Sequence, residues 1–69
     1  MNAHATAEGG ANSVDEFCRS HRISRYTFYN LLKEGRGPSI MKVGARTLIS
    51  SEAAAAWRRR MEDQTARAA

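Results

Sequence analysis

Apolar residues recur with helical spacing in two short segments of the first half of the sequence. In the first segment, Val14, Phe17 and Cys18 are spaced i, i+3 and i+4, which places them on one face of a helix. Residues 13–16 read Ser-Val-Asp-Glu, a capping box in which serine and glutamate satisfy free amides at a helix start. The pattern predicts a helix from Val14 to about Ser20 whose apolar face is buried.

The second helical segment follows an interruption at residues 21–24. Ser24 is a candidate N-cap and Gly35 a candidate terminator, so a helix is expected over residues 25–34. Its apolar face consists of Phe28, Leu31 and Leu32. Its opposite face carries Tyr26, Asn30 and Lys33, with Tyr29 at the edge. Solvent-facing helix positions normally carry charged or small residues, so two tyrosines beside an asparagine indicate a surface that a partner covers.

The two helices are joined by about four residues, and Ile23 is placed to fill the angle between them. This arrangement predicts a helix-turn-helix. A short antiparallel helix pair in an ordinary bundle would show much the same pattern, so the pattern alone leaves both interpretations open.

Residues 35–50 have the pattern of a turn and two short strands rather than that of a helix. Residues 35–38 read Gly-Arg-Gly-Pro and cannot continue a helix. Two short runs, 40–43 and 47–50, then flank Gly44-Ala45-Arg46 and predict a β-hairpin. The glycine near its tip supplies the positive φ that a tight loop needs.

A third helix is expected after the hairpin, capped by Ser50 or Ser51 and reaching about Asp63. One face of this helix carries Ala53, Ala54, Trp57 and Met61. Trp57 is the largest apolar side chain of the sequence, so we expect it at the centre of the core. Arg58, Arg59 and Arg60 cannot share one face, which indicates a mainly solvated run.

These elements predict a mainly α fold with a small β-hairpin, in the order helix, turn, helix, hairpin, helix. A winged helix-turn-helix has this order. The expected domain spans residues 13–63. Residues 1–12 and 64–69 lack a periodic apolar pattern and are expected to form flexible N-terminal and C-terminal tails.

The size of the chain and its charge distribution narrow the class of function. With 69 residues and 7.6 kDa the chain forms at most one thin-cored domain, too small to wall a substrate pocket, so we expect no enzyme. The segment from Arg19 to Arg46 contains seven Lys and Arg residues and one acidic residue, Glu34, so its net charge is +6. The rest of the chain contains four Lys and Arg residues and six Asp and Glu residues, so its net charge is −2. One contiguous cationic block favours a polyanionic partner whose phosphates it neutralises.

Cysteine content and hydropathy argue against a disulfide-bonded protein, a metalloprotein, a secreted protein and a membrane protein. A single cysteine, Cys18, cannot form an internal disulfide, and the sequence shows no zinc-ligand spacing, so neither a metal nor a cofactor is expected. We expect Cys18 to be a small core residue rather than a reactive thiol. No apolar run is long enough for a signal peptide or a membrane span, which favours a cytoplasmic location without a membrane partner.

Four pieces of the sequence also carry a family resemblance through their order and spacing. They are Ile23-Ser24-Arg25-Tyr26-Thr27-Phe28-Tyr29, Lys33-Glu34-Gly35, Lys42-Val43-Gly44 with Arg46, and Ser51-Glu52 followed by Trp57. Over residues 13–61 the chain resembles the small MerR-like helix-turn-helix proteins, which include excisionases of phages and integrative elements and AlpA-type regulators. It departs from them at Ala45, where family wings often carry a basic residue, and at Ala54, where a bulky aliphatic is common.

The resemblance implies that the second helix is a recognition helix and that the hairpin is a wing. It carries over to the DNA-facing positions Ser24, Arg25, Tyr26, Thr27, Tyr29 and Asn30. We expect Arg25, Tyr26 and Asn30 to read base edges, because arginine pairs with guanine and asparagine with adenine in the major groove. Phosphate contacts are expected from Arg22, Lys33, Arg36 and Lys42, and a contact with the backbone or minor groove from Arg46.

The sequence therefore predicts a sequence-specific double-stranded DNA-binding protein without catalytic activity. The resemblance implies an excisionase, or recombination directionality factor, that binds repeated sites cooperatively, contacts neighbouring copies, bends DNA and assembles with a site-specific recombinase at the nucleoid of a bacterium or phage-infected cell. A transcriptional regulator of a phage or mobile element is the alternative within DNA binding. A protein-interaction adaptor that docks through its tyrosines is the alternative from another class, and RNA binding is disfavoured because the hairpin has no aromatic residue for base stacking.

Overall fold

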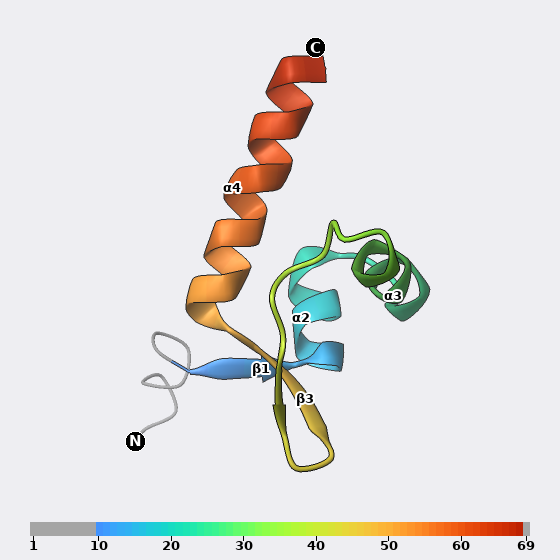
Figure 1. Ribbon diagram of the computed structural model, residues 1–69, viewed down its shortest axis with the longest axis vertical. Helices are drawn as coiled ribbons and strands as arrows, with labels where there is room; N and C mark the ends of the chain where they lie inside the picture. Colours follow the sequence, from blue (N-terminus) through green and yellow to red (C-terminus); the bar gives the residue numbers. More distant parts are fainter. Residues whose placement is uncertain (1–9, 69) are drawn as a thin grey trace.

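The computed structural model describes residues 10–68, which form three helices and a three-stranded antiparallel sheet (Figure 1). The elements in chain order are β1 (Ala11–Ser13), α2 (Val14–His21), α3 (Arg25–Lys33), β2 (Met41–Val43), β3 (Arg46–Ser50) and α4 (Ser51–Ala68). The strand order is β1-β3-β2, so β3 is central. This architecture is compatible with a helix-turn-helix, formed by α2 and α3, followed by a β2–β3 hairpin.

The start of α2 is fixed by the capping box that the sequence predicts. The backbone N–H of Ser13 donates to Glu16 Oε1 at 2.8 Å, and the N–H of Glu16 donates to Ser13 Oγ at 3.2 Å. The helix ends where Arg22 adopts a left-handed conformation with φ of 57°, and the N–H of Ile23 donates back to Cys18 O at 3.0 Å. This left-handed residue turns the chain sharply into α3.

Arg22 offers a direct test of this corner, because a left-handed conformation suits glycine better than any residue with a Cβ. Arg22→Gly and Arg22→Ala both remove the charge, but only glycine relieves the backbone strain. We expect the glycine variant to have a free energy of unfolding about 1 kcal/mol higher than the alanine variant. Urea denaturation measures the difference, and equal midpoints for the two variants would show that the corner is not strained.

Both ends of α3 also carry the predicted signals. Ser24 Oγ accepts a hydrogen bond from the N–H of Thr27 at 3.0 Å, which caps the N-terminus. At the other end Gly35 has φ of 75°, and the N–H of Arg36 donates to Leu31 O at 2.8 Å. This is the geometry of a Schellman C-cap, so the predicted role of Gly35 as terminator is confirmed.

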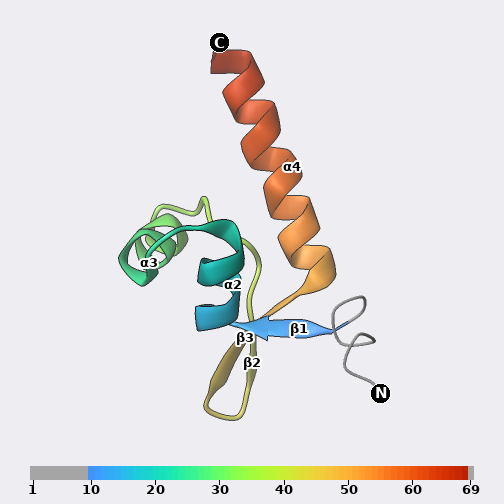
Figure 2. The same cartoon turned by 180° about the vertical axis from the view of Figure 1, so that it is seen from behind.

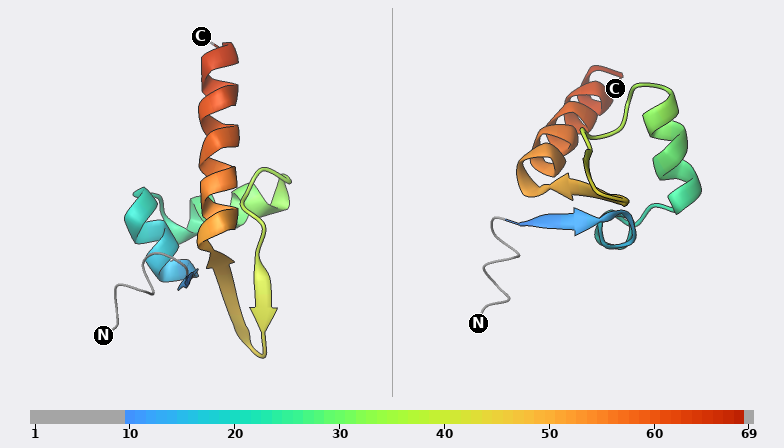
Figure 3. Two further views of the ribbon diagram at one scale, coloured as in Figure 1. Left: turned by 90° about the vertical axis from the view of Figure 1, so that its left-hand side faces the viewer. Right: turned by 60° about the horizontal axis from the view of Figure 1, so that its bottom comes forward.

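The predicted hairpin is confirmed, and the pairing of its two strands defines a two-residue loop. Val43 pairs with Arg46, so the loop consists of Gly44 and Ala45. Gly44 has φ of 61°, as the first central residue of a type II′ turn requires. The hairpin extends away from the helices in the direction opposite to α4 (Figure 3).

The core lies where α2, α3, β3 and α4 meet. Phe17, Phe28 and Ile49 are fully buried, and Val14, Cys18, Ala54 and Trp57 complete the buried cluster. The Trp57 ring lies 5.3 Å from that of Phe17 in an edge-on arrangement, and its Nε1–H donates to Arg36 O at 2.9 Å. Trp57 therefore joins α4 both to α2 and to the segment that follows α3, as the sequence predicts for the centre of the core.

Strand β1 is an element that the sequence analysis does not predict. Residues 1–12 are expected to form a tail, but Ala11–Ser13 pair with β3, with Ala11 opposite Ser50 and Ser13 opposite Leu48 (Figure 2). The N–H of Ser51 also donates to Gly10 O at 3.0 Å. Alanine, asparagine and serine carry no strand pattern of their own, so the conformation of β1 depends on tertiary pairing. The rest of that expected tail, residues 1–9, lies outside the described residues.

Helix α4 is longer than predicted, since it continues past Asp63 to Ala68, through residues assigned to a C-terminal tail. Its last turns contain good helix formers and an i,i+4 ion pair in which Arg67 Nη2 lies 3.0 Å from Asp63 Oδ2. Residues 62–68 are exposed and extend beyond the rest of the fold (Figure 1). Within residues 10–68 there is no helix with the length and apolar character needed to cross a membrane.

Candidate nucleic-acid interface

The two faces of α3 differ as the sequence predicts. Phe28 is fully buried, whereas the Tyr26 side chain is 77% exposed and that of Tyr29 is 44% exposed. Asn30 is half-buried and Lys33 is exposed. The tyrosine and asparagine face is therefore accessible to a partner rather than part of the core.

Ser24 and Thr27, two of the residues that the family resemblance places at the DNA, stabilise the start of α3 through hydrogen bonds with each other. Ser24 Oγ accepts from the N–H of Thr27 and donates to Thr27 Oγ1, each at 3.0 Å. Both residues are exposed. The hydroxyls therefore hold the first turn of α3 in place at the surface where Arg25 and Tyr26 project.

A hollow of about 290 Å³ lies where the start of α2, the first turns of α3 and the tip of the hairpin come together. The residues that line it are Ser13, Val14, Asp15, Arg25, Tyr29, Ala45, Arg46 and Thr47. Arg25 and Arg46 lie more than twenty positions apart in the sequence and both line this hollow. Lys42 belongs to the same region, because its Nζ donates to Thr47 Oγ1 at 3.0 Å.

Further cations lie at both ends of α3. Arg22 lies just before the helix, and Lys33 and Arg36 lie at its end; all three are exposed. An α-helix with its side chains is about 10–12 Å across, which matches the roughly 12 Å width of the major groove. Arg36 is partly neutralised, since its Nη1 lies 3.2 Å from Glu34 Oε1. Every cation predicted to contact DNA is thus at the surface, and none is buried in the core.

Asp15 also belongs to this surface, although the sequence does not predict it there. Its Oδ1 accepts a hydrogen bond from Nη1 of Arg25 in an ion pair. This hydrogen bond, followed by the charge of the carboxylate, raises the pKa of Arg25 above its ordinary value. The Arg25 guanidinium also lies 6.0 Å from the centre of the Tyr29 ring. Asp15 is ten positions from Arg25, and no local pattern in the sequence signals their contact.

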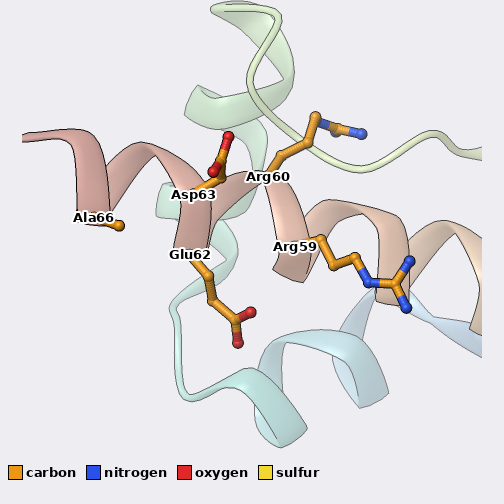
Figure 4. Close-up of a pocket in the computed structure, with 5 residues that line it drawn as sticks. All are labelled: Arg59, Arg60, Glu62, Asp63 and Ala66. Carbon is orange, nitrogen blue, oxygen red and sulfur yellow. The ribbon is translucent and has the colours of Figure 1, made fainter.

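A second hollow, of about 530 Å³, lies along α4 and is lined by Arg59, Arg60, Glu62, Asp63 and Ala66 (Figure 4). All of these residues belong to one helix, which cannot enclose a ligand by itself. Arg58 and Arg60 connect α4 to the rest of the fold. Arg60 Nη2 donates to Gly37 O at 3.0 Å, and Arg58 Nη1 lies 3.1 Å from His21 Nε2. This surface has the character of a solvated helix face.

The remaining candidate for reactive chemistry is the thiol of Cys18, which lies in the core. Cys18 is buried, and desolvation by burial raises the pKa of its thiol, which disfavours the reactive thiolate. Across residues 10–68, His, Cys, Asp and Glu side chains form no cluster of three or more that could hold a metal ion.

Comparison with protein-family models, with curated proteins and with solved structures finds no match for this chain. The resemblance to MerR-like proteins therefore stays a prediction that rests on the four pieces of sequence between Ile23 and Trp57.

Proposed function

We propose that the chain is a sequence-specific double-stranded DNA-binding protein that inserts α3 into the major groove. The observation that carries the proposal is the exposed tyrosine and asparagine face of α3 with cations at both of its ends. The diameter of an α-helix fits the groove, and the flanking cations then lie over the phosphates on either side. In this proposal α2 and α3 form a winged helix-turn-helix with the β2–β3 hairpin as the wing.

Each predicted site residue has a role in this proposal. Arg25, Tyr26 and Asn30 read base edges from the exposed face of α3, next to Tyr29. Arg22, Lys33, Arg36 and Lys42 contact phosphates, which fixes the register without reading sequence. Arg46 lies near the tip of the wing and contacts the backbone or the minor groove.

Self-association on DNA follows from the small size of the domain, since one module of this kind buries only roughly 600–1,000 Å². The outer face of the sheet supplies a surface for such contacts. Met41 and Val43, respectively 42% and 55% exposed, lie on the face opposite buried Ile49, together with half-buried Leu48. Arg46, which pairs with Val43, lies on the same face next to the hairpin tip. We propose that neighbouring copies on repeated sites bury Met41, Val43 and Leu48, while Arg46 contacts DNA.

The cellular role we favour is that of an excisionase that bends DNA together with a site-specific recombinase, as the resemblance implies. A transcriptional regulator of a mobile element is the second candidate, since it would use the same DNA-binding surface. Both roles place the protein in the cytoplasm, at the nucleoid.

Selection of bound sites from a random duplex library, combined with two substitutions, tests the DNA-reading role of α3. Asn30→Ala is expected to weaken binding to the selected site by about 1–3 kcal/mol and to leave binding to a scrambled duplex unchanged, because a base contact is lost. Lys42→Ala is expected to weaken binding to both duplexes alike, because it removes a phosphate contact. Equal losses on both duplexes for Asn30→Ala would defeat the assignment of Asn30.

A further inference from the structure

The Asp15–Arg25 ion pair joins the two helices that the proposed function uses for DNA binding. Of the three ion pairs formed by residues 10–68, the other two lie within one helix or its cap, namely Arg36 with Glu34 and Arg67 with Asp63. Asp15 lies in the first turn of α2, and Arg25 is the first residue of α3. The pair therefore fixes a side chain of α3 relative to α2.

The exposure of this pair indicates a function other than stabilising the fold. The side chains of Arg25 and Asp15 are 58% and 60% exposed, and an ion pair that is this open to water contributes little to stability. Its effect on conformation is larger, because an arginine side chain has many rotamers and a carboxylate partner selects among them. The Tyr29 ring, 6.0 Å from the guanidinium, restricts the same side chain from a second direction.

The chemistry of the guanidinium allows Arg25 to bind Asp15 and a base at the same time. An arginine has five N–H donors, and the ion pair with Asp15 engages Nη1. Two of the remaining donors are sufficient for the bidentate contact to O6 and N7 of guanine. A guanidinium that is already oriented loses less conformational freedom when it makes that contact.

The same carboxylate has an unfavourable effect on DNA binding in general. It places a negative charge in the hollow that Arg25 and Arg46 line, where it repels phosphates of any sequence. A residue that weakens binding to all DNA but orients one base-reading side chain increases the difference between correct and incorrect sites.

We propose that Asp15 is a positioning residue that holds Arg25 in the orientation for reading one guanine, and so sets the specificity of the protein at that base pair. This inference rests on the proposed function, because it deepens the role of Arg25 in DNA recognition.

The test compares Asp15→Asn with Asp63→Asn, which makes the same charge change in an ion pair on the free end of α4. Arg25→Ala first identifies the base pair, as the position where the wild type discriminates and this variant does not. At that position Asp15→Asn is expected to reduce discrimination about tenfold, the lower part of the range for one bidentate base contact. Binding of Asp15→Asn to a scrambled duplex is expected to rise severalfold, while Asp63→Asn changes neither quantity.

Three outcomes would overturn the inference, and they separate it from the proposed function. If the wild-type protein binds no duplex, both fail. If the wild type discriminates among sequences but Arg25→Ala does so equally well, Arg25 reads no base and the role of Asp15 is lost. If Arg25→Ala loses discrimination at one base pair and Asp15→Asn retains it there, DNA recognition stands and only the positioning role of Asp15 fails.

Discussion

Replacing Trp57 with alanine is expected to leave most of the protein unfolded at 25 °C. The side chain is only 7% exposed, and its ring packs edge-on against Phe17 and His21, with centroids at 5.3 and 5.5 Å. Deleting a buried tryptophan costs about 3–5 kcal/mol. The single core of a chain below about 70–80 residues rarely supplies more than about 3–5 kcal/mol of stability. The loss is therefore comparable with the whole stability.

Far-UV circular dichroism during urea titration measures this effect, since the variant lacks the only tryptophan. Trp57→Phe is the matched control, because it keeps an aromatic ring in the core and removes the N–H that donates to Arg36 O. We expect the control to remain folded, with a loss of about 1–2 kcal/mol for the missing hydrogen bond and smaller ring. A Trp57→Ala protein that unfolds at nearly the same urea concentration as the wild type would contradict the central place of Trp57 in the core.

The helices and the hairpin could be predicted from the sequence because their signals are local. The capping box at Ser13, the cap at Ser24 and the terminator at Gly35 all lie within a few residues of the boundary that they fix. The apolar spacing likewise identifies the buried faces of all three helices. In each case the interactions that decide the conformation join residues three to five positions apart.

The elements that the sequence did not predict depend on distant partners or on weak signals. Strand β1 exists because Ala11–Ser13 pair with β3, almost forty positions away. The last turns of α4 have no apolar face, so periodicity could not show that the helix continues after Asp63. Their stability comes from helix propensity and from the Arg67–Asp63 pair.

In the candidate site, too, features with a local sequence signal could be predicted, and features that depend on distant residues could not. The helical wheel places Tyr26 and Asn30 on the outer face of α3, and the structure agrees for exposed Tyr26 and half-buried Asn30. That Arg25 and Arg46 line one hollow, and that Arg25 pairs with Asp15, depends on the tertiary fold. The charge block from Arg19 to Arg46 consequently could not reveal that a carboxylate from outside the block lies within the cationic surface.

The affinity for duplex DNA is expected to fall about 150- to 500-fold when the salt concentration rises from 50 to 200 mM. This range follows from four or five phosphate contacts and a slope of about −0.9 per contact in a plot of log affinity against log salt. The expected contacts are those of Arg22, Lys33, Arg36, Lys42 and Arg46, all of which are exposed. Docking of the tyrosines on a protein partner would depend little on salt, so the same experiment separates the adaptor hypothesis from DNA binding.

Fluorescence anisotropy of a labelled duplex across this salt range, with two variants, tests the DNA-binding surface most directly. Lys42→Ala removes a cation of the hairpin, and Arg67→Ala removes one at the free end of α4. We expect a slope near −4 for the wild type, a slope smaller in magnitude by about 1 for Lys42→Ala, and no change for Arg67→Ala. A wild-type slope near zero, or the same reduction in both variants, would contradict DNA binding through α3 and the hairpin.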